Sequence, residues 1–161
     1  MPREIERKFL PKSDAWRAQV RESRPMSQGY LASSGNVSVR VRVAGNEAWL
    51  NIKAGGFVAS RQEYEYPVPV GEARELLALA DGPLIEKTRH FVEHGGSTWE
   101  IDEFHGDNSG LIVAELELDS EDAPFARPPW LGVEVTRLRR YYNVCLVTHP
   151  YRAWNETERN P

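Results

Sequence analysis

Along most of this chain, apolar and charged side chains alternate one by one, which is the period of a β-strand. The segment from Val37 to Val43 shows this most clearly, because four valines occupy one face and Ser38, Arg40 and Arg42 occupy the other. The alternation recurs in residues 4–9, 48–53, 61–66, 87–89, 99–104 and 114–118. The sequence therefore predicts antiparallel strands with one apolar face and one ionic face.

The ionic faces carry both signs of charge in nearly equal number. The carboxylates are Glu4, Glu6, Glu63, Glu65, Glu100, Asp102, Glu115 and Glu117, and the cations are Lys8, Arg40, Arg42, Lys53, Arg61, Lys87 and Arg89. Two architectures fit this pattern, because periodicity fixes which residues share a face but not which face is inside. Either an open sheet exposes the ionic face to water, or the sheet closes into a barrel with the ionic side chains in its lumen. Buried ions are costly unless they are compensated, so a charged barrel implies a charged ligand.

The chemistry of that ligand follows from the two kinds of charge. Clustered arginines and lysines bind polyanions, and carboxylates in the same volume need a cation such as Mg²⁺ or Mn²⁺. A triphosphate with a divalent metal satisfies both groups, and hydrolysis would use the metal and the basic side chains to neutralise the transferring phosphoryl group. The simpler interpretations are a solvated strand face for Glu4 and Glu6 and cross-strand salt bridges for Glu115 and Glu117.

The length of 161 residues fits one domain. We expect this domain to cover residues 1–150, followed by a frayed tail over residues 151–161. Helices are expected at about residues 14–21, 71–81 and 138–148, and the last has an apolar stripe at helical spacing. The residues of that stripe are Leu138, Tyr141, Tyr142, Cys145 and Leu146.

The charge and the cysteine content exclude several classes of protein. The formal net charge is -4 and basic residues are interleaved with acidic ones, which disfavours nucleic acid and membrane surfaces as partners. The single cysteine, Cys145, permits no internal disulfide and is best explained as a small core residue. We expect a cytoplasmic protein, monomeric or homodimeric, whose partner is a small molecule.

The segment Glu4-Ile5-Glu6-Arg7-Lys8 resembles the Glu-x-Glu-x-Lys signature of the CYTH domain, the bacterial branch of the triphosphate tunnel metalloenzymes. Further segments resemble the family's blocks in their usual order, namely residues 28–30, 39–42, 50–53, 61–65, 86–89, 99–102, 114–117 and 134–136. The resemblance implies an α+β fold with a closed eight-stranded antiparallel β-barrel, a charged lumen and helices packed outside. It is closest to the stand-alone bacterial inorganic triphosphatases.

The activity implied by this resemblance is metal-dependent hydrolysis of tripolyphosphate to pyrophosphate and phosphate, with Mg²⁺ or Mn²⁺ as the cofactor. The family also contains adenylate cyclases and thiamine triphosphatases. Cyclisation of ATP, hydrolysis of nucleoside or thiamine triphosphates, and binding of polyphosphate or nucleotide without turnover are therefore the alternatives.

The resemblance also implies roles for individual residues. The implied metal ligands are Glu4, Glu6, Glu115 and Glu117, with Asp102 as a further candidate. The implied phosphate contacts are Lys8, Arg40, Arg42, Lys53, Arg61, Lys87 and Arg89. Of all these, Glu4, Glu6, Lys8 and Arg42 are the expected catalytic residues, and Glu63, Glu65 and Glu100 are expected to orient the basic side chains.

Overall fold

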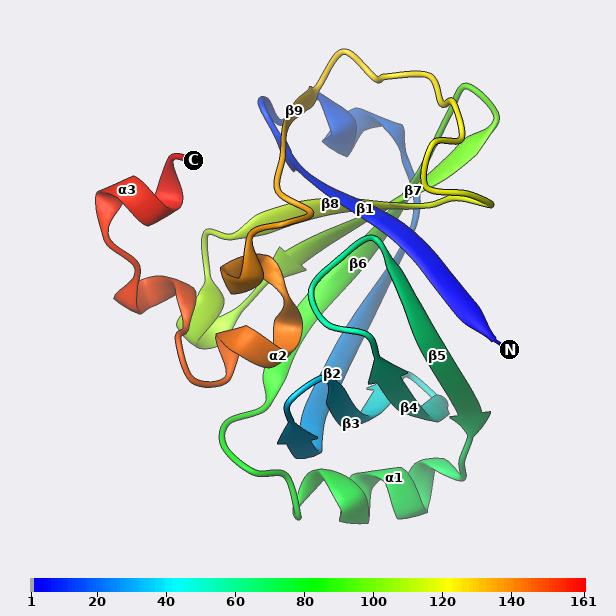
Figure 1. Cartoon of the computed structure of the whole chain (residues 1–161), viewed down its shortest axis with the longest axis vertical. Coiled ribbons are helices and arrows are strands. Elements are labelled where there is room, and N and C mark those ends of the chain that lie inside the picture. The colour runs from blue at the N-terminus through cyan, green and yellow to red at the C-terminus, as the bar shows by residue number, and fades with distance from the viewer. Residues whose placement is uncertain (1) are drawn as a thin grey trace.

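The computed structural model describes residues 2–161, so Met1, at which the expected domain begins, lies outside the described residues. The strands are β1 (Arg3–Pro11), β2 (Val20–Ser34), β3 (Val37–Ala44), β4 (Glu47–Ala54), β5 (Ser60–Pro67), β6 (Ile85–His94), β7 (Ser97–Phe104), β8 (Ile112–Glu117) and β9 (Leu131–Glu134). The helical segments are η1 (Ala15–Gln19), α1 (Val70–Leu77), η2 (Gly106–Asn108), η3 (Arg139–Tyr141), α2 (Asn143–Leu146), η4 (Tyr151–Ala153) and α3 (Glu156–Arg159). Figure 1 shows the strands wrapped around a common axis.

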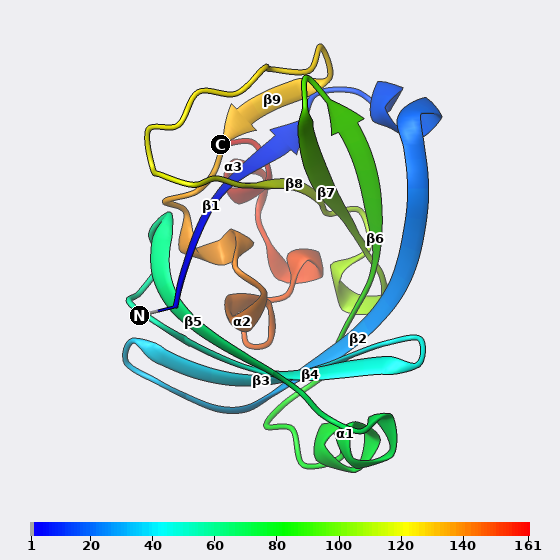
Figure 2. The same ribbon diagram turned by 90° about the vertical axis from the view of Figure 1, so that its right-hand side faces the viewer.

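The sheet closes through its first strand. Its order is β5-β4-β3-β2-β6-β7-β8-β1-β9, and β1 also pairs with β5. Residues 3–5 of β1 pair with β5, residues 6–9 pair with β8, and the end of β1 pairs with the short strand β9. The result is a closed eight-stranded antiparallel barrel with β9 added beside β1, seen as a ring in Figure 2. The predicted barrel is confirmed, and the alternative of an open sheet is wrong.

The apolar strand faces point outward and are covered on two sides. The helix α1 packs on β2, β3 and β4, where Val41, Val43 and Ala48 meet Ala73 (Figure 1). A second cluster centres on Phe9, Trp16, Trp99 and Trp130 and is covered by η1 and the loop before β9. These layers leave the inner faces of the strands for the ionic side chains.

One end of the barrel is apolar inside. Ile85, Phe104 and Val113 lie on the same strand faces as the charged residues of β6, β7 and β8, because every second residue shares a face. They pack against Tyr141 and Leu146 of the C-terminal segment. Figure 2 shows α2 within the outline of the ring of strands, and residues 142–144 line the cavity. We call η3 and α2, with Tyr142 between them, the closing segment, because it closes one end of the lumen.

Several local expectations are corrected by the structure. The helix expected over residues 71–81 is α1, which ends at Leu77, and the one expected over residues 14–21 is the shorter η1, because β2 already begins at Val20. The continuous helix over residues 138–148 is wrong, because Tyr142 is extended (φ -82, ψ 138) between η3 and α2. The helices pack around the barrel as expected, with α2 at one of its ends.

The frayed tail over residues 151–161 is wrong as well. These residues form η4 and α3, and Trp154 is buried with its ring centroid 5.0 Å from that of Tyr141. A capping box at Asn155 and Glu158 begins α3. Within residues 2–161, no helix is long and apolar enough to cross a membrane.

Candidate active site

The lumen of the barrel holds a cavity of about 370 Å³ whose walls are ionic. Every predicted site residue except Asp102 lines it: Glu4, Glu6, Lys8, Arg40, Arg42, Lys53, Arg61, Glu63, Glu65, Lys87, Arg89, Glu100, Glu115 and Glu117. Further lining residues are Tyr30, Ser38, Tyr142, Asn143 and Val144. The two-residue period of the strands therefore brings the predicted residues together from seven different strands, β1 and β3 to β8.

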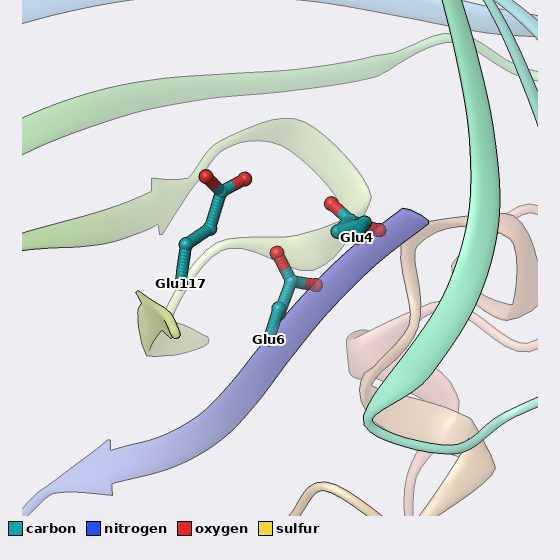
Figure 3. A group of neighbouring side chains, drawn as sticks. All are labelled: Glu4, Glu6 and Glu117. Atoms are coloured by element: carbon teal, nitrogen blue, oxygen red, sulfur yellow. The ribbon is translucent and has the colours of Figure 1, made fainter. Parts of the chain in front are cut away.

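Three carboxylates meet in one part of this cavity. Glu4 and Glu6 of β1 and Glu117 of β8 each offer one oxygen, and these oxygens lie within 4.8 Å of one another (Figure 3). Burial, together with the neighbouring carboxylates of Glu100 and Glu4, raises the pKa of Glu117 to about 7. Burial and the nearby Glu115 also raise the pKa of Glu6. We call Glu4, Glu6 and Glu117 the acidic cluster, and its mutual repulsion favours a bound cation.

Lys8 lies beside this cluster and is held between two carboxylates. Its Nζ donates to Glu6 Oε1 and to Glu115 Oε1, both at 2.9 Å. Burial lowers the pKa of Lys8, but Glu115 and Glu6 outweigh that effect and leave the pKa above its usual value. Burial likewise opposes ionisation of Glu115, yet Lys8 and Arg89 hold its pKa well below the usual range. Lys8 therefore stays charged, and Glu115, a predicted metal ligand, is engaged in ion pairs.

Asp102, the other predicted metal ligand outside the acidic cluster, is fully buried beneath two cations. Arg89 donates to it through Nε at 2.8 Å and Nη2 at 2.9 Å, and Lys87 Nζ donates at 2.7 Å. Arg89 Nη1 also donates to Glu100 at 2.8 Å. Burial opposes ionisation of Asp102, but Arg89 and Lys87 keep its pKa below the usual value. In this arrangement Asp102 positions cations, and its role toward a metal stays a prediction.

On the opposite wall, two arginines of β3 have little compensating charge. Arg40 and Arg42 are largely buried, and within the described part of the chain their Nε atoms have no hydrogen-bond partner. The carboxylate nearest to Arg42 is Glu65, at 3.9 Å, and Glu65 also accepts from Asn51 Nδ2 at 2.7 Å. Burial, together with the charges of Arg40 and Arg89, lowers the pKa of Arg42 to about 10. We call Arg40 and Arg42 the arginine pair, and an anion would satisfy it.

Lys53 of β4 and Arg61 of β5 lie beside the acidic cluster. Lys53 Nζ lies 3.0 Å from Glu4 Oε2 and 3.1 Å from Glu63 Oε2, and Arg61 Nη2 lies 3.6 Å from Glu4 Oε2. Because Glu4 has these two cations close by, the acidic cluster and the predicted phosphate contacts share one volume. Glu63 is thus an ion-pair partner of Lys53, and its supporting role stays a prediction.

Two adjacent residues of the closing segment contact the lumen cations, and neither was predicted. The ring of Tyr142 lies under Lys8 Nζ at 4.7 Å and Arg61 Cζ at 4.9 Å from its centroid. Its hydroxyl donates to Thr136 O at 2.7 Å. Asn143 contacts Lys87. No periodic pattern marks Tyr142 and Asn143 as lining residues. Tyr30, by contrast, could have been predicted to line the cavity, because the alternation of β2 gives it an inward position.

Comparisons with known proteins agree with this geometry. The sequence model of the CYTH domain matches residues 2–149. The chain is similar to an inorganic triphosphatase of Acetivibrio thermocellus, with 45% identity over 157 residues that cover 97% of this chain and 100% of that relative. An inorganic triphosphatase of Nitrosomonas europaea is 39% identical over 149 residues, covering 89% of this chain and 95% of the relative. The crystal structure of the inorganic triphosphatase NE1496 has a TM-score of 0.64 and 36% identity, covering 89% of this chain and 93% of that one.

Proposed function

The chain belongs to the CYTH domain family, and from this premise we propose that it hydrolyses inorganic triphosphate to pyrophosphate and phosphate. Its relatives at 39% and 45% identity are inorganic triphosphatases, and they are matched over nearly their whole length. The residues that line the lumen give this proposal its chemistry.

One observation supports this function best: the lumen brings together a group of carboxylates and a pair of arginines, each with like charges close to one another. In the acidic cluster, burial and neighbouring carboxylates raise the pKa values of Glu6 and Glu117. The arginine pair has buried nitrogens without partners, and the pKa of Arg42 is lowered. A triphosphate with a divalent metal brings one cation and several phosphate oxygens into the same cavity, and so compensates both groups at once.

The acidic cluster fits Mg²⁺ or Mn²⁺. These ions prefer hard oxygen ligands and are commonly held by a few carboxylates together with substrate phosphates. Glu4, Glu6 and Glu117 would hold such an ion. When bound, the metal supplies neutralisation of phosphoryl charge and a lowered pKa for a bound water.

The basic side chains of the chain bind and orient the phosphates. Arg40 and Arg42 can each donate to two phosphate oxygens, because a guanidinium presents its N–H groups as a planar fork. Lys8, fixed by Glu6 and Glu115, donates its remaining N–H from a defined position. These donors are positioned by the strands before the reaction, so charge that develops on the transferring and leaving oxygens is stabilised without rearrangement of the site.

The activity is tested by phosphate release from tripolyphosphate, ATP and thiamine triphosphate, each with Mg²⁺, Mn²⁺ or EDTA. We expect metal-dependent release from tripolyphosphate in equal amounts of phosphate and pyrophosphate, with slow release from the other two. An Arg42→Met variant should be inactive, while Arg24→Met, at an exposed arginine of β2, should match the wild type. Cyclic AMP formed from ATP would identify a cyclase instead, and no turnover of any of the three compounds would overturn the proposal.

A further inference from the structure

Asn143, the first residue of α2, reaches from the closing segment to a lumen cation. Its side chain is largely buried, and its Oδ1 accepts from Lys87 Nζ at 3.0 Å and from Gln28 Nε2 at 2.7 Å. An ammonium group can only donate, so the atom that faces Lys87 is the carbonyl oxygen of the amide. Two donors from β2 and β6 thus converge on one oxygen and fix the orientation of the Asn143 side chain.

The same contact fixes the ammonium of Lys87. Lys87 is 2% exposed and lines the cavity. One of its N–H groups is directed to Asp102 Oδ2 at 2.7 Å and a second to Asn143 Oδ1. An ammonium is tetrahedral, so two fixed N–H bonds determine the direction of the third. Among the residues described, Lys87 has no other hydrogen-bond partner, and its third N–H remains available to a ligand in the cavity.

The surroundings of Asn143 make a purely structural role a poor explanation. This end of the lumen is otherwise filled by apolar side chains such as Ile85, Phe104 and Leu146, so a buried amide here carries a desolvation cost that an apolar side chain would not. The Gln28 that supports Asn143 is 0% exposed, and its own Oε1 has no hydrogen-bond partner within residues 2–161. Two buried amides, one of them incompletely satisfied, are therefore used where apolar residues would be more stable.

A neutral acceptor suits this position chemically. An aspartate would orient Lys87 equally well, but it would add a second carboxylate beside Asp102 and repel phosphate. An aliphatic residue would leave the ammonium free to rotate about its contact with Asp102. The amide oxygen directs Lys87 without adding negative charge to a cavity that must admit a polyanion.

We propose that Asn143 is a positioning residue for triphosphate hydrolysis, which directs the free N–H of Lys87 toward a phosphate oxygen. This inference rests on the proposed function. Asn143 acts through Lys87, so its effect should require Lys87 to be present.

The test is a double-mutant cycle with Asn143→Leu and Lys87→Met, measured as kcat and KM for tripolyphosphate with Mg²⁺. Asn143→Leu removes the acceptor at similar volume and leaves the contact of Lys87 with Asp102 in place. Because a hydrogen bond to a charged group is lost, we expect kcat to fall about 10- to 100-fold while KM changes little. In the Lys87→Met background, Asn143→Leu should cause no further loss of kcat/KM.

Asn108→Leu is the matched control, because Asn108 is another buried asparagine whose Oδ1 accepts from a backbone amide, that of Tyr151, away from the cavity. It should lower the melting temperature and leave kcat and KM unchanged below that temperature. If Asn143→Leu does not fold, Asn143→Ala removes the same acceptor without steric conflict, and the same comparisons apply.

The two proposals fail in different ways. A wild-type protein that does not turn over tripolyphosphate overturns the proposed function. An active wild type together with an unchanged kcat in the Asn143 variant overturns the positioning role alone. The same conclusion follows if the Asn143 substitution causes an equal further loss in the Lys87→Met background, since a structural role predicts that additivity.

Discussion

Replacing Arg42 by methionine should make the ligand-free protein more stable while it removes the activity. Arg42 lies on β3 in the cavity wall, with its Nε unpartnered and its nearest carboxylate 3.9 Å away. Methionine keeps much of the alkyl stem and removes the charge. The folded protein then no longer has to hold a cation that is buried close to Arg40 and Arg89.

The size of the effect follows from the pKa of Arg42, which burial lowers to about 10. At about 1.4 kcal/mol for each pKa unit, holding this charge in the ligand-free lumen costs on the order of 3 kcal/mol. Against this, the substitution loses the contact between Arg42 Cζ and the ring of Trp49, 5.7 Å from its centroid. Such a contact contributes about 1 kcal/mol. The free energy of unfolding should rise by about 2 kcal/mol, and the melting temperature by about 4–8 °C.

Arg89→Met is the matched variant and should have the opposite effect. Arg89 donates two hydrogen bonds to Asp102 and one to Glu100, so its loss removes most of the charge that compensates these carboxylates. Breaking a buried ion pair in this way costs about 3–5 kcal/mol. Two arginines in one lumen should therefore differ in the sign of their effect on stability.

The assay is urea and thermal unfolding in EDTA, repeated with Mg²⁺ and tripolyphosphate. In EDTA we expect Arg42→Met to be more stable than the wild type and Arg89→Met to be less stable. With ligand, the wild type should gain stability and Arg42→Met should gain much less. A loss of stability for Arg42→Met in EDTA that equals the loss for Arg89→Met would refute the reasoning, because Arg42 would then be a compensated structural cation.

Three other substitutions test separate parts of the structure. Glu6→Gln removes one carboxylate of the acidic cluster and should raise the Mg²⁺ concentration for half-maximal activity about tenfold or more; an unchanged metal titration would exclude Glu6 as a ligand. Glu103 has its pKa lowered to about 2, chiefly by hydrogen bonds from Arg17, so its stabilising effect is present near pH 7 and is lost as the pH falls toward 2. Glu103→Gln should thus lower the free energy of unfolding, measured in urea, by about 1 kcal/mol at pH 7 and leave it unchanged near pH 2. A difference between the wild type and the variant that does not depend on pH would contradict this. Trp154→Ala should lower stability by about 3 kcal/mol, since Trp154 is buried against Tyr141, and an unchanged melting temperature would show that residues 151–161 contribute nothing to the core.

The residues of the lumen could be predicted from the sequence because strand side chains alternate with a strict period of two. Arg40 and Arg42 share the inward face of β3 with Ser38, and the valines between them face outward, as the alternation requires. The same rule places Glu4 and Glu6 on one face of β1. Membership of a face is a local property of the chain, so a single sequence is sufficient to identify it.

The closure of the barrel is not a local property. It depends on pairs such as Glu4 with Arg61, which are far apart in the sequence and join β1 to β5. Alternation alone is equally compatible with an open sheet, and only the family resemblance implies the closed barrel. The roles that the resemblance gives to single carboxylates remain predictions, because cross-strand neighbours decide whether a carboxylate pairs with a cation, as Asp102 does, or joins a cluster of acids, as Glu117 does.

The closing segment could not be predicted because tertiary contacts determine its conformation. Leu138, Tyr141 and Leu146 have helical spacing, but they pack as separate short turns against the apolar end of the lumen. Tyr142 is extended because its ring lies under Lys8 and its hydroxyl bonds to the backbone of residue 136. A helical propensity over ten residues is easily outweighed by such contacts.

The central claim is that one lumen holds a metal at the acidic cluster and phosphates at the arginine pair. Its most direct test is a crystal structure of the protein with Mn²⁺ and a methylene-bridged tripolyphosphate analogue, in which the anomalous signal locates the metal. We predict an anomalous peak in contact with Glu4, Glu6 and Glu117, and phosphate density against Arg40 and Arg42. A metal peak outside the lumen, or an analogue bound away from the two arginines, would contradict the claim.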